Sequence, residues 1–267
     1  MSRSHASRAR EQRSGSTRKL LSQNFLRDAS IARRLVASSG VGPDDLVIEV
    51  GPGDGMVTRP LLGQVRRVIA YEKDRHFVER LRSRLGHHEH FRCHHADFRD
   101  VRAPREPFHV VSNAPFGITT DIVRWCLHSR SLASATLVTQ LEFARKHTGD
   151  FGRWSRLTVE HWPEFSLNLG MRIDRREFRP VPQVDAAVIH LRRRPKPLLP
   201  KAALRDYRDL VDLGFSGVGG SLAASVSRVV PKRLAARACA EAGIARDQPV
   251  GLVPPDRWIV LFEALSR

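Results

Sequence analysis

The stretch LVIEVGPGDGMVT, residues 46–58, constrains the fold of this chain more than any other. It opens with four apolar residues around one acid, a short β-favouring run that suits a strand buried on both faces of a parallel sheet. Glycines follow at alternate positions, Gly51, Gly53 and Gly55, and glycine adopts backbone angles that are closed to other residues. The stretch therefore predicts a strand that enters a tight turn, where a small ligand can approach the main chain. An ordinary turn of an α/β domain is the plainer interpretation.

The acid after the next strand indicates which ligand fits this turn. Residues 67–71 read as a second strand, and Glu72 ends it about 20 residues after the glycines, where a carboxylate can accept hydrogen bonds from both ribose hydroxyls. No Gly-Lys-Ser/Thr of a P-loop is present, and Asp54 between the glycines would repel a pyrophosphate. The pattern therefore favours an adenosyl ligand without phosphates.

The chain carries a large excess of positive charge. Lysine and arginine number 45, against 28 for aspartate and glutamate, which gives a net charge of +17. Such a surplus points to a polyanionic partner, because each cation placed on a phosphate releases counterions, and nucleic acid is the leading candidate. No Lys-rich amphipathic helix and no apolar stretch of membrane-spanning length stands out, so we expect no membrane association.

Cysteine and histidine usage argues against disulfides and metal. The three cysteines, Cys93, Cys126 and Cys239, are scattered along the chain without a disulfide framework or a metal-ligand spacing. The histidines of residues 87–95 would point to both faces of a short strand, so we do not expect three of them to converge on one ion, although their number is what a metal site would need. Because the first residues also lack the apolar core of a signal peptide, we expect a cytoplasmic protein in a reducing compartment, with no metal.

A second informative stretch is FHVVSNAPF, residues 108–116, where a strand ends in a polar residue, a small residue, a proline and an aromatic. Pro115 restrains Ala114 to an extended shape, so the side chain of Asn113 and the carbonyl of Ala114 can face one spot. Phe116 offers a ring beside them. Two acceptors and a ring suit an extruded base that carries an exocyclic amine. The alternative is a strand-to-helix turn with a buried phenylalanine.

Two further polar residues are candidate ligand contacts. Asn24 stands beside the apolar residues Phe25 and Leu26, where an asparagine is ordinarily a turn residue. Asp97 follows a third predicted strand, on the ligand side of an open sheet, and can accept a hydrogen bond from an adenine amine or cap a turn. Neither residue is decisive by itself.

Four arginines lie close in sequence to one aromatic near the end of the α/β part. Arginine with an aromatic is a grip for bases and phosphates, and a solvated cluster around a core phenylalanine is the alternative. The residues concerned are Arg172, Arg175, Arg176, Arg179 and Phe178.

The chain divides into three predicted parts. Residues 1–19 hold six Lys or Arg and one Glu with almost nothing to bury, so we expect a disordered basic arm that either lies along phosphates or is simply solvated. Residues 20–195 alternate strands and helices, as in an α/β domain. A proline-rich linker, residues 192–200, leads to residues 196–267, whose pattern is helical throughout.

Helix signals place the individual segments. Apolar periodicity and caps predict helices over 28–40, 55–62, 74–85, 119–127, 151–162 and 201–213, with shorter ones beginning near 221, 231, 246 and 255.

Taken together, five motifs resemble the rRNA adenine dimethyltransferases in order and spacing. The phenylalanine at 116, the Ser-Gln-Asn-Phe-Leu start and the basic arm look more like the Erm enzymes, which methylate 23S rRNA and confer resistance to macrolides, lincosamides and streptogramin B. The resemblance covers about residues 19–195 strongly and the helical part only in kind. It implies a Rossmann-like class I methyltransferase sheet with a small C-terminal all-α domain. The motifs are Gln23-Asn24-Phe25-Leu26, Glu49-x-Gly51-x-Gly53-x-Gly55, Glu72 with Asp97, Asn113-Ala114-Pro115-Phe116, and Phe178-x-Pro180-x-Pro182-x-Val184-Asp185.

The resemblance also implies a role for each motif residue. S-adenosylmethionine would be the methyl donor and an adenine amine the acceptor. Asn113 and the Ala114 carbonyl would hold that amine, Phe116 would stack on the base and Phe178 would close over it, which makes Asn113 and Phe116 the expected catalytic residues. The expected cofactor-binding residues are Asn24, Leu26 and Gly51 at the methionine part, Gly53 in the same turn, Glu72 at the ribose, Asp97 at the adenine, and Asn113.

The implied partner is 23S rRNA, as protein-free or precursor large-subunit RNA, and the enzyme would act as a monomer. Ala114 stands where relatives carry a larger apolar residue and Phe116 lacks a hydroxyl, so the choice among rRNA targets is open. The alternatives are a small-subunit 16S rRNA dimethyltransferase, an inactive binding relative of the same fold, and a DNA amino-methyltransferase with the same Asn-x-Pro-Phe turn. The number of methyl groups added is also open.

Overall fold

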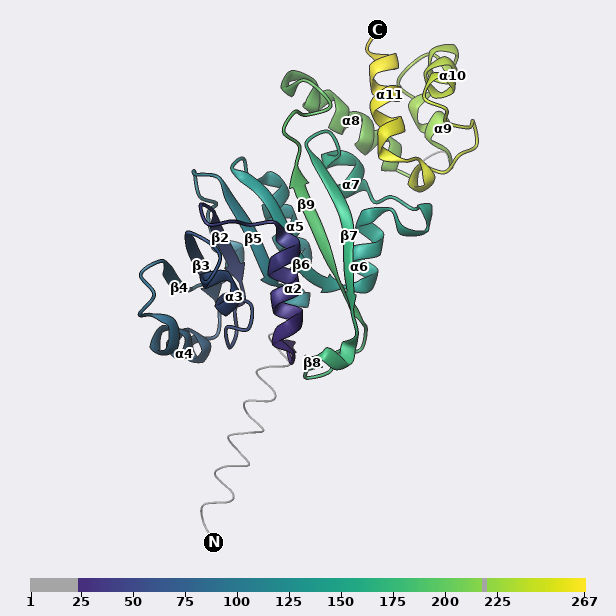
Figure 1. The fold of residues 1–267 in the computed structure, drawn as a ribbon. Helices are drawn as coiled ribbons and strands as arrows, with labels where there is room; N and C mark the ends of the chain where they lie inside the picture. Colours follow the sequence, from purple (N-terminus) through teal and green to yellow (C-terminus); the bar gives the residue numbers. More distant parts are fainter. Residues whose placement is uncertain (1–23, 218–219) are drawn as a thin grey trace. The chain divides into compact units, whose positions relative to one another are not determined.

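The structure, a computed structural model, describes residues 24–217 and 220–267 and contains a mostly parallel seven-stranded β-sheet (Figure 1). Strand β2, Leu46–Val50, has all five residues buried, as expected of a strand covered on both faces. It pairs in parallel with β3, Arg67–Glu72, on one side and with β5, Phe108–Asn113, on the other. The predicted α/β class is therefore confirmed. The basic arm predicted for residues 1–19 lies outside the described residues.

The strand order places a switch point between β2 and β5. The sheet order is β4-β3-β2-β5-β6-β9-β7, so the chain moves outward from β2 to β4 and then returns to the opposite side of β2. In open α/β sheets a ligand binds beyond the carboxyl ends of the strands at such a point. The glycine turn follows β2 and the Asn113 turn follows β5, so both predicted motifs lie there. The other strands of the sheet are β4 (Phe91–His95), β6 (Leu132–Gln140), β7 (Phe165–Ile173) and β9 (Ala186–Arg193).

The helices near this sheet begin and end where the sequence marks them, with one exception. Asp28 and Asp74 cap the first residues of α2 and α4, and Gly40 ends α2 in the left-handed conformation. Helix α3 begins at Thr58 instead of the predicted Gly55, because the φ of +85° at Gly55 cannot be part of a helix. Helix α2 lies across β5 and β6 (Figure 1). The helices are α2 (Ala29–Ser39), α3 (Thr58–Leu62), α4 (Arg75–Leu85) and α5 (Thr119–His128).

A two-stranded ribbon ties together two segments that are distant in sequence. Strand β1, Phe25–Leu26, pairs antiparallel with β8, Phe178–Arg179. Just beyond the ribbon, the backbone N–H of Arg27 donates to the Glu177 carbonyl at 2.8 Å. The proline-stiffened stretch predicted after Phe178 therefore holds the chain immediately after Asn24.

The region after β6 differs from its prediction. One helix over 151–162 is expected, but the structure has α6 at Leu141–Thr148 and a short α7 at Arg156–His161. Between them Phe151 adopts φ +61°, which excludes it from any right-handed helix. The first half of the predicted helix is therefore wrong, and α6 was missed because it follows Gln140 directly, without a capping residue.

The C-terminal helices pack around their own hydrophobic core. Tyr207 and Trp258 are fully buried in it, and Gly214 lies so close to the Trp258 ring that an added Cβ would be 2.3 Å away. The predicted starts near 221, 231 and 255 are confirmed. The start predicted near 246 is wrong, because the Gln248 side chain folds back on the backbone of Ala245 and forms a turn. The helices are α8 (Leu204–Phe215), α9 (Leu222–Val226), α10 (Lys232–Glu241) and α11 (Pro255–Leu265).

Backbone packing groups the chain into two compact units. The first consists of the chain up to Leu141 together with Gly170–His190, and the second of Glu142–Leu169 together with Leu191–Arg267. Residues 142–169 thus pack with the C-terminal helices although they precede the predicted boundary at 195, and that division into domains stays a prediction. Among the described residues, no helix is long and apolar enough to span a membrane.

Candidate active site

A cavity of about 380 Å³ lies in the first unit, at the carboxyl ends of β2, β3 and β5. The turns after all three strands contribute to its wall, together with the residues before and in β1. Seven predicted site residues line it: Asn24, Leu26, Gly51, Gly53, Glu72, Asp97 and Asn113. The structure therefore brings the predicted cofactor-binding residues to one place.

The glycine turn after β2 supports the cavity wall through close packing. Gly51 and Gly53 have φ values of +65° and +56°, which L-residues with side chains rarely adopt. A Cβ on Gly51 would lie 2.8 Å from Cγ of Pro115, and one on Gly53 would lie 2.5 Å from the Phe25 ring. The two glycines thus let the turns after β2 and β5 and strand β1 meet around one cavity.

Glu72 is held in place by backbone donors at the end of β3. Its carboxylate accepts the N–H of Gly53 at 3.1 Å and that of Asp74 at 2.8 Å. Burial raises the pKa of Glu72, and the two backbone hydrogen bonds oppose this rise. The carboxylate is therefore fixed against the glycine turn, where an acceptor for ribose hydroxyls is predicted.

Asp97 is already engaged with two cations that the sequence interpretation did not include. Its two oxygens accept four hydrogen bonds, from Lys73 Nζ at 2.8 Å and from the backbone N–H, Nε and Nη2 of Arg99 at 3.1, 3.0 and 2.6 Å. These contacts, with Arg99 first, hold the pKa of Asp97 well below its usual range. Since a carboxylate has about four lone-pair positions, an adenine amine would have to replace one of these donors. Both cations line the cavity, and their positions beside Glu72 and Asp97 in sequence are the signal that could have found them.

Asn113 is oriented by the backbone of Asn24. Its Nδ2 donates to the Asn24 carbonyl at 2.7 Å, and because a carbonyl only accepts, this contact fixes which side of the amide carries the oxygen. The Oδ1 atom is buried and has no hydrogen-bond partner. A buried acceptor without a donor costs free energy, so an Oδ1 left unpaired in the wall of a cavity is a site for a ligand N–H.

The two predicted aromatic contacts are not part of the cavity wall. Phe116 is half-buried and packs against the core of the first unit, and Phe178 is fully buried in that core. Their rings meet edge to face, with centroids 6.2 Å apart. Neither aromatic predicted to touch a base therefore lines the cavity, and Phe178 belongs to the core.

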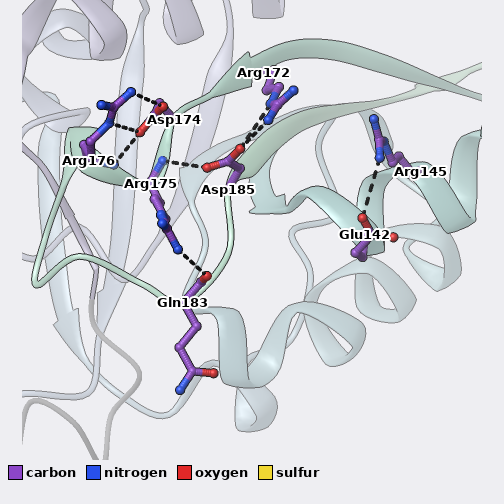
Figure 2. Close-up of polar contacts among 8 residues, drawn as sticks. All are labelled: Glu142, Arg145, Arg172, Asp174, Arg175, Arg176, Gln183 and Asp185. Carbon is purple, nitrogen blue, oxygen red and sulfur yellow. Dashed lines mark hydrogen bonds and ion pairs between the residues drawn. The ribbon is translucent and has the colours of Figure 1, made fainter.

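Two of the four arginines predicted as a grip for bases and phosphates are held by neighbouring acids. Arg172 donates to Asp185 at 2.5 Å, and Arg176 turns onto Asp174 at 2.9 Å (Figure 2). Arg175 donates its backbone N–H to Asp185 and its guanidinium to the Gln183 carbonyl, at 3.0 and 3.1 Å. These contacts brace the stretch around β8 and leave less of its positive charge for a partner.

Glu49 is a buried acid in the cavity wall to which the sequence interpretation gave no role. It is 1% exposed and accepts a hydrogen bond from Thr58 Oγ1 at 2.7 Å. Burial, with smaller contributions from the charges of Glu72 and Asp54, raises its pKa to about 8. The carboxyl group is therefore mostly protonated at neutral pH.

The remaining titratable residues do not form a metal centre within the described part of the chain. No group of three or more His, Cys, Asp or Glu side chains there is arranged to hold an ion. All three cysteines are free and buried.

Comparison with known proteins gives matches along nearly the whole chain. The profile of the family described as ribosomal RNA adenine dimethylase matches residues 15–267. The chain is 48% identical to an rRNA methyltransferase from Streptomyces thermotolerans, over 97% of this chain and 88% of that protein. It is 47% identical to an rRNA adenine N-6-methyltransferase from Aeromicrobium erythreum, over 93% of this chain and 74% of that protein. The crystal structure of the 23S rRNA methyltransferase ErmE is similar with a TM-score of 0.88 at 46% identity, over 91% of this chain and all of that one.

Proposed function

Because this chain belongs to the ribosomal RNA adenine dimethylase family, we propose that it transfers methyl from S-adenosylmethionine to the exocyclic N6 amine of one adenine in 23S rRNA. The enzyme is an rRNA adenine N6-methyltransferase, and modification of its target gives resistance to macrolide-type antibiotics. Its substrate is protein-free or precursor large-subunit RNA, on which it acts as a monomer in the cytoplasm. The 46% identity to the ErmE chain in its crystal structure, over all of that chain, supports the large-subunit RNA over 16S rRNA.

The observation that carries this proposal is the unpaired Oδ1 of Asn113. Asn24 holds the amide so that Oδ1 accepts a hydrogen bond from the target amine. An adenine amine is a poor nucleophile, because its lone pair is shared with the ring. An acceptor at Oδ1, with the Ala114 carbonyl as a second one, favours a pyramidal nitrogen and offsets the positive charge that develops on it.

The cavity suits S-adenosylmethionine by the hydrogen-bond acceptors in its wall. Its carboxyl side chains are Glu49, Asp54, Glu72 and Asp97. Because Glu49 is mostly protonated and Asp97 is paired with Lys73 and Arg99, acceptors for the ribose hydroxyls and the adenine amine support this ligand more than net charge does. When bound, this cofactor supplies an activated methyl group on a sulfonium. Glu72 would hold its ribose and the glycine turn its methionine part. Asp97 would take its adenine amine in place of one donor from Lys73 or Arg99.

Positioning explains most of what this chain must contribute. The methyl donor is already electrophilic, so the residues around the cavity mainly orient the amine and exclude water. No strong base is needed for this task. Phe116, which follows Pro115 directly and is half-buried, is the proposed ring that contacts the base. Phe178 then supports Phe116 from the core, and it would have to leave the core to meet the base itself.

Labelled methyl transfer to separate RNAs tests the proposal. The purified chain is given tritiated S-adenosylmethionine with 23S rRNA, 16S rRNA or duplex DNA, and the labelled nucleotide is mapped by mass spectrometry. We expect N6-methyladenine at one position of 23S rRNA, and macrolide tolerance when a susceptible host expresses the chain. Label in 16S rRNA alone would assign the chain to the small subunit, label in duplex DNA would indicate a DNA methyltransferase, and cofactor binding without any label would indicate an inactive relative.

A further inference from the structure

Phe151 is a large apolar side chain that the fold presents to solvent at a cost. It is 74% exposed, and its backbone is left-handed with φ +61° and ψ +20°. Gly149 and Gly152 beside it are also left-handed, at φ +77° and +68°. A bulky residue rarely adopts these angles, and strain of this kind is retained where a function needs it. Packing does not explain it here, because among the described residues most of the side chain has no neighbour.

The loop around Phe151 is anchored on both sides. A Cβ on Gly149 would lie 2.3 Å from the Trp154 ring, and the backbone N–H of Trp154 donates to the Gly251 carbonyl at 2.8 Å. Asp150 accepts the backbone N–H of Phe151 at 3.1 Å and pairs with Arg145 Nε at 2.9 Å. The ring is therefore held out by an ordered turn.

One cation lies over the exposed ring, and two more are close to it in sequence. The Arg145 guanidinium carbon lies 4.9 Å from the ring centroid, within the range of a cation–π contact. Arg145 is held in place by Asp150 and by Glu142, the latter at 3.6 Å (Figure 2). Lys146 and Arg153 next to the loop are exposed and, within the described part of the chain, make no ion pair.

We propose that Phe151 is a stacking platform for an unpaired base of the RNA substrate, with Lys146 and Arg153 on the flanking phosphates. An exposed ring beside cations is the combination that single-stranded nucleic acid requires, because every base has a π-face and every linkage a negative charge. The local sequence Gly-Asp-Phe-Gly-Arg offers no further apolar surface for a protein partner or a lipid. This proposal concerns how the RNA substrate of the proposed methyltransferase is bound. It rests on the proposed function only for the identity of the RNA.

Two substitutions of Phe151 separate the ring from the backbone. Phe151→Asn removes the ring but suits a left-handed backbone, so the fold should be at least as stable as in the parent. Phe151→Trp keeps a stacking surface. Val229→Asn is the matched control, since Val229 is another apolar residue of the same unit and is 64% exposed. Affinity is measured by fluorescence anisotropy for a looped 23S rRNA fragment, a looped 16S rRNA fragment and fully paired duplex RNA, with thermal unfolding and cofactor binding recorded alongside.

For Phe151→Asn we expect about 5- to 10-fold weaker binding of both looped RNAs, which corresponds to the lower end of the range for loss of one base–aromatic stack. Binding of the duplex should be unchanged. The Trp variant should bind like the parent, and its added fluorescence should be quenched by looped RNA. Because binding is measured without methyl transfer, a wrong RNA target would not hide the effect. Parent-like binding of looped RNA by Phe151→Asn would overturn the proposal. The proposal would also be overturned if Phe151→Asn weakened duplex binding as much as looped-RNA binding, or if Val229→Asn weakened looped-RNA binding equally. If Phe151→Asn changed only the self-association of the chain, Phe151 would instead be assigned to a contact between copies of the chain.

Discussion

The cavity turn and the Phe151 loop both use left-handed backbone, for opposite purposes. At Gly51 and Gly53 an added Cβ would collide with Pro115 or Phe25, so the glycines are required by packing as well as by conformation. At Gly152 nothing lies within 4 Å of where a Cβ would be, so conformation alone selects glycine there. Beside it Phe151 takes the same conformation without being a glycine. In the first unit, left-handed glycines thus let the turns after β2 and β5 and strand β1 close around a cavity. In the second unit, left-handed residues hold the Phe151 ring in solvent.

The largest expected effect tests the unpaired acceptor in the cavity. Asn113→Ala should lower kcat about 100- to 1,000-fold, as loss of one preorganised group at a developing charge does elsewhere, while the affinity for S-adenosylmethionine stays within about threefold. The kcat of Asn113→Asp should lie between that of the parent and that of Asn113→Ala, because the aspartate keeps the oxygen but repels the Asn24 carbonyl. Single-turnover methylation and calorimetric binding measure the two quantities.

Asn168→Ala is the matched control for Asn113, since Asn168 is an exposed asparagine of β7. It should methylate like the parent. If Asn113→Ala transferred methyl at the parent rate, the role assigned to its Oδ1 would be wrong.

The next effect compares two glycines directly. Gly53→Ala adds left-handed strain of about 1–2 kcal/mol and a collision with Phe25 that costs about 1–3 kcal/mol more, whereas Gly152→Ala adds the strain alone. Urea unfolding should therefore rank Gly53→Ala as clearly less stable. Cofactor affinity should also fall for Gly53→Ala and remain parental for Gly152→Ala. Equal losses of stability would mean that packing at the cavity turn is unimportant.

Glu49→Gln should flatten the pH dependence of stability. Burial raises the pKa of Glu49 from 4.5 to about 8, so between these values the folded chain holds a proton that the unfolded chain has released. The stability linked to this proton is fully present below pH 4.5 and is lost as pH rises toward 8. In thermal unfolding of the cofactor-free chain, the stability of Glu49→Gln relative to the parent should increase as pH rises over that range. If the stability of Glu49→Gln and that of the parent changed in parallel with pH, this prediction would be wrong. Glu79→Gln, at an exposed glutamate, serves as the control.

The smallest effect concerns the brace around β8. Asp185 accepts the Arg172 side chain and the Arg175 backbone, and β8 pairs with β1 next to Asn24, which orients Asn113. Asp185→Asn should lower kcat by about fivefold or less, because an exposed ion pair contributes at most about 1 kcal/mol. The KM for S-adenosylmethionine should hardly change. Removing the exposed Arg75–Glu79 pair by Glu79→Gln should have no effect on kcat. An equal loss of kcat in Glu79→Gln would mean that the Asp185 contacts act only through the general stability of the fold.

Sequence reasoning succeeded where the signal is local. The strand 46–50, the caps Asp28 and Asp74 and the residues that end strands at one edge of the sheet were all predicted, because turn chemistry and apolar runs act over a few residues. It failed at residues 141–155. There two short helices flank a left-handed phenylalanine, a conformation that no propensity suggests.

Within the candidate site, the sequence by itself determined which polar residues stand at the ends of the strands, and therefore that Asn24, Glu72, Asp97 and Asn113 are candidates. Only the tertiary structure decided what each of them faces. It paired Asp97 with Lys73 and Arg99 and turned Asn113 so that Oδ1 is unpaired. It also buried Phe178 in the core, where its ring meets that of Phe116 edge to face. The physical reason is that a strand or a cap is specified by neighbours in the chain, whereas burial and hydrogen-bond partners depend on segments far apart in sequence.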